Sequence, residues 1–199
     1  MAKQQFKPGT LIYPVPAVMV SCGDFPDEKN IVTVAWTGTV NTNPPMTYIS
    51  LRPERHSYEI IKRTGEFVIN LTTKDITRAC DYCGVKSGRD TDKFSDTKLT
   101  PFASTKVKAP SIYESPVNIE CKVKEIIPLG SHHMFIAEVV NINVSDEYID
   151  ETGKFNFNKS NPVCYSHGGY FSLGSQLGTF GYSIKKPVKT KPRKNKNRH

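Results

Sequence analysis

The sequence lacks any uninterrupted apolar segment of the roughly 18 residues that a membrane-spanning helix requires. Its most apolar N-terminal stretch, residues 11–20, is interrupted by Pro14 and Pro16 and has no small-residue cleavage site at its end, which argues against a secretory signal. Cysteine is scarce and odd in number, with five in 199 residues, which does not suit a disulfide-stabilised secreted domain. We therefore expect a cytoplasmic protein with no membrane segment.

Acidic residues are absent from the C-terminal stretch, and this absence explains the charge of the whole chain. The sequence has 27 Lys and Arg against 19 Asp and Glu, a net charge of +8, and eight of the basic residues lie in residues 185–199. The rest of the chain is formally neutral, which argues against a basic face that binds nucleic acid specifically. We predict one domain over residues 1–184 and a basic disordered tail over 185–199, whose contacts with nucleic acid or anionic membrane would be weak and salt-dependent.

A glycine-rich dinucleotide fingerprint is also missing. The candidate segment, Gly174–Gly178, has too few glycines at the wrong spacing, and the second half of the chain offers no alternation of strands and helices. These absences exclude a doubly wound nucleotide-binding fold.

The segments that are present predict mainly antiparallel strands. Runs of β-branched and apolar residues indicate strands at 17–22, 31–36, 46–51 and 67–71, and alternation indicates a hairpin of 118–124 with 132–144. Two short helices are expected, one capped by Ser57 and ended by Gly65, the other running from Thr73 to about Tyr82 with Gly84 as its stop. Residues 86–116 are expected to form a long loop. The pattern favours an all-β or α+β barrel.

A candidate anion site lies around Ser50, Arg52 and Ser57. Ser50 and Arg52 share one face of a strand, and Ser57 is placed at the start of a helix, where free amides and the helix dipole favour a phosphate. The alternative interpretation is a solvated edge with surface arginines. The single tryptophan, Trp36, is followed by Thr37 and Gly38, and taken alone it is better explained as a core anchor before a turn than as part of a binding site.

In order and spacing, several motifs together resemble the flavin reductase-like, flavoredoxin branch of the FMN-binding split-barrel proteins. The resemblance extends to about residue 184 and rests on the motifs within 16–23, 30–38, 43–45, 49–57, 65–71, 87–94, 129–133 and 162–170.

This resemblance implies a mainly β (α+β) fold, a six-stranded antiparallel split β-barrel with short flanking helices, which forms a homodimer with one FMN per subunit near the interface. By position, the isoalloxazine ring would contact Asn30, Trp36, Thr37 and Gly38. The ribityl chain and phosphate would contact Ser50, Leu51, Arg52 and Ser57, with Lys93 as a further cation. His132 matches a Gly-x-His element and Tyr165 would flank the flavin, while Ser131 stands where many relatives carry an acid.

The expected function is that of an FMN-binding oxidoreductase that transfers electrons from NAD(P)H or a protein donor to flavin or a small-molecule acceptor. Because the hydride chemistry belongs to the cofactor, no catalytic acid–base residue is assigned. Two alternatives stay open at this point: a non-enzymatic carrier or sensor that holds flavin or haem, and an RNA-associated barrel that binds through its tail. At least one of His132 and His133 is expected to be structural.

The cysteine spacing raises one further alternative. Cys80 and Cys83 have the spacing of a redox or metal motif, and Cys164 with His167 would complete a zinc quartet. Both cysteines of the first pair fall at the end of a predicted helix with no knuckle or ribbon pattern around them, so no metal site is predicted. From the resemblance, Cys83 is expected close to the flavin.

Overall fold

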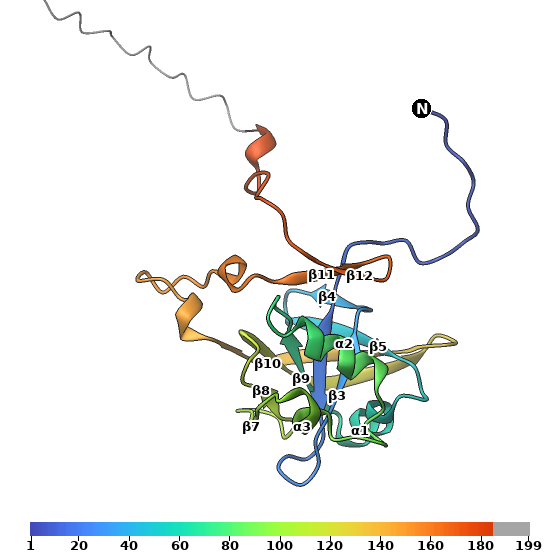
Figure 1. Ribbon diagram of the computed structural model, residues 1–199, viewed down its shortest axis with the longest axis vertical. Coiled ribbons are helices and arrows are strands. Elements are labelled where there is room, and N and C mark those ends of the chain that lie inside the picture. The colour runs from blue at the N-terminus through green and yellow to red at the C-terminus, as the bar shows by residue number, and fades with distance from the viewer. Residues whose placement is uncertain (185–199) are drawn as a thin grey trace, which may run out of the picture.

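A computed structural model describes residues 1–184, and the predicted basic tail at 185–199 lies outside these residues (Figure 1). The principal element is an antiparallel seven-stranded sheet with the strand order β3-β2-β6-β9-β10-β5-β4. Its strands are β2 (Val18–Cys22), β3 (Asn30–Val34), β4 (Thr37–Asn41), β5 (Met46–Leu51), β6 (Glu66–Leu71), β9 (Val117–Pro128) and β10 (His133–Val144).

The long hairpin of β9 and β10 bends this sheet into a split barrel. Each strand has 12 residues, and their pairing shifts register twice, between Ile136 and Ala137 and between Val139 and Asn141. Such bulges bend a strand and increase its twist. As a result, β10 pairs with β9 and also with β5, which closes the core between the two halves of the sheet.

The core is apolar because each strand around it either alternates between buried and more exposed residues or is buried on both faces. Every residue of β2 is buried, whereas β5 alternates, with Thr47, Ile49 and Leu51 buried. Phe67 and Phe135 fill the centre of the core and are fully buried. The hairpin prediction is confirmed: Cys121 is buried in this cluster, and Ile119 and Val123 pack against it.

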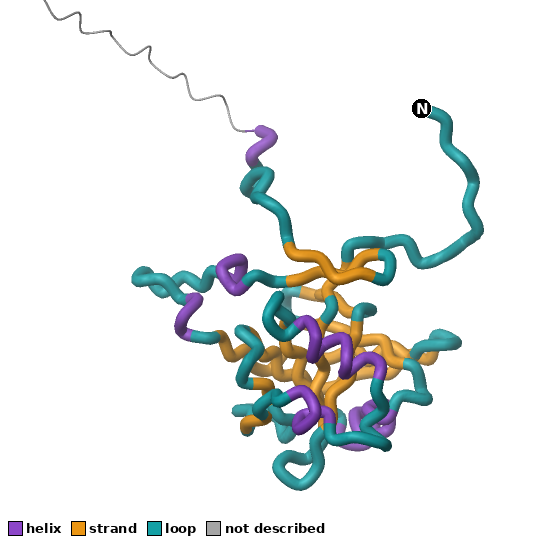
Figure 2. The backbone as a smooth tube through the Cα atoms, viewed as in Figure 1, coloured by secondary structure: helices purple, strands orange, loops and turns teal. Residues whose placement is uncertain are grey.

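Three helices flank the barrel: α1 (His56–Thr64), α2 (Thr77–Val85) and α3 (Lys93–Thr97). In Figure 2 they lie around the strands that form the centre of the molecule. The left-handed residue Gly65, with φ of 69°, ends α1 as predicted. Ser57 does not cap this helix, since the N-cap position is Arg55 and no side chain accepts a bond there.

Two other boundaries differ from the predictions. Helix α2 begins at Thr77 rather than Thr73 and continues through Gly84 to Val85. The segment 86–116 is more regular than expected: Asp92 accepts bonds from the amides of Phe94 and Ser95 and so caps α3, and β7 (Pro101–Phe102) pairs with β8 (Ser111–Ile112).

A second, three-stranded sheet with the order β1-β11-β12 stands at one end of the barrel (Figure 1). It consists of β1 (Val15–Pro16), β11 (Val163–Ser166) and β12 (Gly169–Ser172), none of which was predicted. Single-turn 3₁₀ helices occur at Asp146–Tyr148, Phe157–Ser160 and Tyr182–Ile184. The N-terminal and C-terminal segments extend from this end as two arms, away from the barrel (Figure 1).

The predicted fold class is thus confirmed, with seven strands in the main sheet where six were expected. Within residues 1–184, no helix is long and apolar enough to cross a membrane.

Candidate functional site

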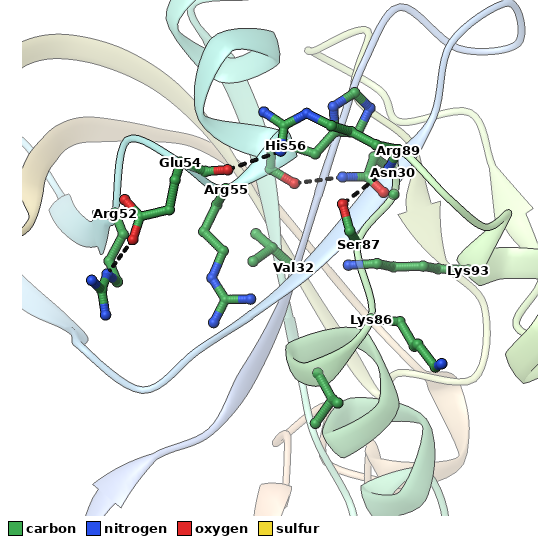
Figure 3. A pocket seen from close by; sticks show the side chains of 13 residues that line it. Asn30, Val32, Arg52, Glu54, Arg55, His56, Lys86, Ser87, Arg89 and Lys93 are labelled. Carbon is green, nitrogen blue, oxygen red and sulfur yellow. Dashed lines mark hydrogen bonds and ion pairs between the residues drawn. The ribbon is translucent and has the colours of Figure 1, made fainter.

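The densest group of polar and charged side chains surrounds a cavity of about 230 Å³ between the start of α1 and the segment that follows α2 (Figure 3). Strand β3 forms its floor, with Asn30 and Val32. The other lining residues are Arg52, Glu54, Arg55, His56, Ser57, Val85, Lys86, Ser87, Gly88, Arg89 and Lys93.

The inner wall of this cavity consists of three buried polar side chains. Asn30, Ser57 and Lys93 are each no more than 5 % exposed. The amide of Asn30 donates to the hydroxyl of Ser57 over 2.7 Å. The ammonium of Lys93 donates to the backbone oxygens of Ile31, at 2.7 Å, and Cys83, at 2.8 Å. An ammonium has three N–H donors, so one remains for a ligand. Burial lowers the pKa of Lys93.

Two arginines join the two sides of the cavity. Arg55 donates through Nη1 to the backbone oxygen of Gly84 at 2.9 Å, and Arg89 donates through Nη1 to the backbone oxygen of Glu54, also at 2.9 Å. The loop before α1 is therefore bonded both to the last turn of α2 and to the loop that follows α2. Gly88 lies so close to the inner wall that a Cβ atom there would come within 2.2 Å of Oδ1 of Asn30.

The cavity has a strongly positive potential. Five lining residues are cations, namely Arg52, Arg55, Lys86, Arg89 and Lys93. The one acidic lining residue in the described part of the chain, Glu54, pairs with Nε of Arg52 at 2.7 Å. Burial lowers the pKa of His56, and the charges of Arg89 and Lys93 add to this effect. No side chain caps the first amides of α1, and the first two residues of this helix, His56 and Ser57, line the cavity. Together these groups favour a phosphate.

A second cavity, of about 130 Å³, adjoins the first and shares Val32, Arg52 and Arg55 with it. It is lined by residues 32–36 at the end of β3, by Ser50–Arg52 at the end of β5, and by His132. His132 lies within 3.0 Å of the hydroxyl of Ser131, and burial together with the charge of Arg52 lowers its pKa. Its neighbour His133, the first residue of β10, instead forms a hydrogen bond of 2.7 Å with the hydroxyl of Tyr58 in α1. His133 does not line this cavity.

A third cavity, of about 310 Å³, continues from the second and has aromatic walls. Tyr13 lies 6.4 Å from Trp36 and 6.5 Å from Tyr165, measured between ring centroids. Tyr165 in turn meets Tyr170 edge to face at 5.4 Å. The hydroxyl of Tyr170 donates to Oδ1 of Asp81 at 3.1 Å. Trp36 and Arg55 line both this cavity and the second one, so the three cavities form one groove.

The structure brings most of the predicted site residues to this groove. The first cavity includes Asn30, Arg52, Ser57 and Lys93, the second Trp36, Ser50, Leu51, Arg52 and His132, and the third Trp36 and Tyr165.

Two predicted residues lie elsewhere, on β4. The hydroxyl of Thr37 donates to the backbone oxygen of Tyr48 at 2.6 Å, and Gly38 lies against the Tyr48 ring. Neither is among the residues that line the three cavities.

Several lining residues were absent from the predicted set. Arg55 and Tyr170 occur inside the motifs at 49–57 and 162–170, and Ser87 and Arg89 belong to the motif at 87–94. These four residues could therefore have been predicted from the motifs that contain them. Tyr13 precedes every motif, and only the pairing of β1 with β11 brings it to the groove.

The two cysteines of α2 lie behind the groove. Cys80 and Cys83 are buried, and burial raises the pKa of Cys83 to about 12, so its thiol stays protonated at neutral pH. Cys83 is nevertheless adjacent to the site, because its backbone oxygen holds Lys93. No group of three or more His, Cys, Asp or Glu side chains among residues 1–184 is arranged to hold a metal ion.

An antiparallel split barrel with a cationic pocket that continues into an aromatic cavity defines a protein of the flavin-binding split-barrel class. The chain belongs to the flavin reductase-like family: the family described as flavin reductase like domain matches residues 10–174. The flavoredoxin of Desulfovibrio vulgaris (Miyazaki F) is 31% identical, with a TM-score of 0.85 over 92% of this chain and 100% of that chain.

Two further relatives extend the comparison. The flavoredoxin of Methanosarcina acetivorans is 25% identical, with a TM-score of 0.84 over 93% of this chain and 100% of that one. An uncharacterized protein of Pyrococcus abyssi is 32% identical over 150 residues, which are 74% of this chain and 86% of the relative.

Proposed function

We propose that the protein is an FMN-binding oxidoreductase that passes electrons from NAD(P)H or a protein donor to free flavin or a small-molecule acceptor. The observation that carries this proposal is the continuous groove, which begins in a cationic pocket at the start of α1 and ends between aromatic rings. A flavin mononucleotide has the same division, with a phosphate at one end and a flat ring system at the other.

The residues of the groove fit FMN in their chemistry. Ser57, the free N–H of Lys93 and the first amides of α1 would hold the phosphate. Ser50 and Arg52, at the end of β5, would contact the ribityl chain. Trp36 and Tyr165 offer apolar surface for the ring. When bound, FMN supplies the hydride and electron transfer chemistry.

The same residues favour a negatively charged group over a neutral one. On the inner wall, Asn30 donates to Ser57, and Lys93 uses two of its three N–H donors on backbone oxygens. The carboxylate of Glu54, which also lines the pocket, is paired with Arg52. A ligand without negative charge would leave the buried ammonium of Lys93 uncompensated, at a cost of about 1–3 kcal/mol.

We include a homodimer in this proposal, and the two arms support it. Large apolar side chains are exposed on both: Leu11 and Ile12 on the N-terminal arm, and Leu173, Leu177 and Phe180 on the C-terminal arm. Apolar surface of this kind is commonly covered by a partner. Light scattering after size exclusion would give twice the chain mass, and a single chain mass would refute this part of the proposal.

The cytoplasm is the proposed compartment, supported by the five free cysteines of residues 1–184. The proposed flavin-binding unit is residues 1–184. A chain that ends at residue 184 is expected to bind FMN with unchanged affinity, and a loss of FMN binding would contradict this division.

An anaerobic reduction experiment tests the proposed activity. The FMN-loaded protein is mixed with NADH and, separately, with NADPH, and the flavin absorption near 450 nm is followed. Bleaching by either nucleotide is expected and identifies the donor. Bleaching only by a reduced protein partner would assign the role of an electron carrier. A flavin band that no donor bleaches would contradict an oxidoreductase and favour a flavin-binding sensor.

A further inference from the structure

The third cavity differs in charge from the rest of the groove. The first cavity is lined by cations, and its carboxylate, Glu54, is paired with Arg52. In the described part of the chain, the one acidic side chain that lines the third cavity is Asp81 of α2, and it lines neither of the other two. Arg55 lines all three cavities and bonds the backbone oxygen of Gly84. The aromatic end of the groove therefore carries a carboxylate that the phosphate end lacks.

Asp81 belongs to a connected set of side chains. The hydroxyl of Tyr170 donates to Oδ1 of Asp81 at 3.1 Å, and the rings of Tyr170 and Tyr165 meet edge to face at 5.4 Å between centroids. Tyr165 lies 6.5 Å from Tyr13, which lies 6.4 Å from Trp36. All five residues line the third cavity. Printed contacts thus join four aromatic rings and one carboxylate around a single space.

The helical period of α2 directs Asp81 to this cavity. Asp81, Gly84 and Val85 are spaced by three and four residues, so they share one face of the helix, and all three line the cavity. Cys80 and Cys83 lie in the buried cluster on the other side of α2. The carboxylate is therefore placed by a helix that is anchored in the core.

Tyr170 fixes the carboxylate without neutralising it. Tyr170 and Tyr165 pack against the same buried cluster as α2. Burial and the charge of Asp81 raise the pKa of Tyr170, so its hydroxyl stays protonated at neutral pH and continues to donate. Within residues 1–184 no cationic side chain pairs with Asp81. Its negative charge is oriented but uncompensated.

Aromatic faces and a carboxylate attract the same kind of ligand, which is an organic cation. A cation within about 6 Å of the centroid of a Trp or Tyr ring is attracted by the negative face of that ring, and the attraction is stronger where water is excluded. We propose that the third cavity binds a planar aromatic cation, with Asp81 selecting its charge and Tyr170 positioning Asp81.

This inference rests on the proposed function, because the donor named there becomes such a cation. The nicotinamide ring of NAD(P)H is neutral. It becomes a pyridinium cation when its C–H bond breaks and the hydride, with both electrons of that bond, passes to FMN. Rings that exchange a hydride must be in contact, and the third cavity shares Trp36, the proposed neighbour of the flavin ring, with the second. Asp81 would stabilise the positive charge as it develops.

Two small molecules of equal shape test the site without any turnover. The probes are 1-methylnicotinamide, a pyridinium cation, and 3-methylbenzamide, its uncharged analogue with carbon in place of the ring nitrogen. Their dissociation constants for the FMN-saturated protein are measured by ligand-observed NMR at low salt. The cation is expected to bind about tenfold more tightly than the neutral probe, and this preference is expected to shrink near about 0.5 M salt.

Three variants assign the contacts. Asp81→Asn keeps the shape and removes the charge, so the preference for the cation is expected to fall to about twofold while the neutral probe binds as before. Tyr170→Phe keeps the ring and removes the hydroxyl that orients Asp81, and a smaller loss, to about fivefold, is expected. The matched control is Asp96→Asn, because Asp96 is an exposed carboxylate that accepts from the hydroxyl of Tyr82 at 2.7 Å and lines none of the three cavities.

The outcomes decide between an organic cation and an uncharged aromatic ligand. A preference for the cation that Asp81→Asn removes and Asp96→Asn leaves intact supports the inference. Equal binding of the two probes, tighter binding of the neutral probe, no binding of either, or a preference that Asp81→Asn leaves unchanged would overturn it. Displacement of FMN by the cation would overturn it too, because the flavin ring would then occupy the third cavity.

Failure of the proposed function gives a different result. A protein that takes up no FMN contradicts that function before either probe is added. The unloaded protein still reports on the cavity, because a preference for the cation that is lost in Asp81→Asn would support the site, and equal binding of the probes would overturn it.

Discussion

A single methyl group at Gly88 is expected to damage the phosphate pocket. In Gly88→Ala the new Cβ would stand 2.2 Å from Oδ1 of Asn30, 2.7 Å from its Cγ and 2.9 Å from Cδ2 of His56. Ordinary van der Waals contact begins at about 3.4 Å, so Asn30 must retreat by about 1.2 Å. Gly88 has no positive φ, so the whole effect is steric.

The retreat of Asn30 breaks a buried hydrogen bond. Its amide lies 2.7 Å from the hydroxyl of Ser57, and a displacement of that size takes the pair out of hydrogen-bond range. The retreat of Asn30 relieves the steric clash, and a buried group left without its partner costs about 1–3 kcal/mol. We expect the free energy of unfolding to fall by about 1–3 kcal/mol and FMN affinity to fall about tenfold, which equals about 1.4 kcal/mol.

Flavin fluorescence titration measures the affinity, and urea unfolding measures the stability. The matched control is Gly174→Ala, because a Cβ at Gly174 meets no atom within 4 Å. The control is expected to behave as the wild type in both assays. A Gly88→Ala protein whose dissociation constant for FMN stays within twofold of the wild-type value would refute the reasoning, since the inner wall would then tolerate the displacement.

Three further predictions concern the same groove. Lys93→Met leaves the backbone oxygens of Ile31 and Cys83 without their donor, so urea unfolding should show that the free energy of unfolding falls by about 1–3 kcal/mol. FMN titration should show an affinity more than tenfold weaker. An unchanged FMN affinity would exclude Lys93 from the phosphate site. The pKa of His56 lies below its ordinary value, so protonation of His56 opposes folding and the free energy of unfolding falls as the pH drops below about 6.5. Proton NMR should show this pKa rising when FMN binds, because the negative phosphate offsets the positive charge of Arg89. A pKa that stays constant on FMN binding would contradict the site. Trp36 is the only tryptophan and lines two of the cavities, so FMN should quench most of the tryptophan emission, and full emission in the complex would place the ring elsewhere.

Most of the barrel could be predicted because its strands have strong local patterns. The buried run of β2 and the alternation of β5 and β9 identify the strands by themselves. Strand β4 was missed because Thr37 and Gly38 resemble a turn, and its later residues are exposed at the edge of the sheet, where no apolar alternation is needed.

The end of α2 was misplaced for a different reason. Glycine is a common helix stop, and Gly84 was interpreted in that way. In the structure it lies inside the helix, where a Cβ would come within 3.1 Å of Cβ of Thr33. Close packing of α2 against β3 favours a glycine at this position, and no local pattern in the sequence shows that contact.

The candidate site was predictable as a set of residue types but not as a set of contacts. Ser57 and Arg52 follow from the expectation of a phosphate at a helix start. The bonds from Arg55 to Gly84 and from Arg89 to Glu54 join segments that are 29 and 35 residues apart in the chain, and they exist only after the barrel has folded. Residue spacing therefore predicts the ligand, whereas only the structure reveals how the two sides of the cavity are bonded to each other.

The most direct measurement compares FMN with riboflavin, which differs from FMN by the phosphate alone. Both are titrated into the flavin-free protein and their fluorescence is followed. One FMN per chain is expected, bound at least a hundredfold more tightly than riboflavin, because charge-assisted bonds from Lys93 and Ser57 with the amides of α1 together supply about 3 kcal/mol or more. Equal affinities, or no binding of either flavin, would contradict a flavin site built on this pocket.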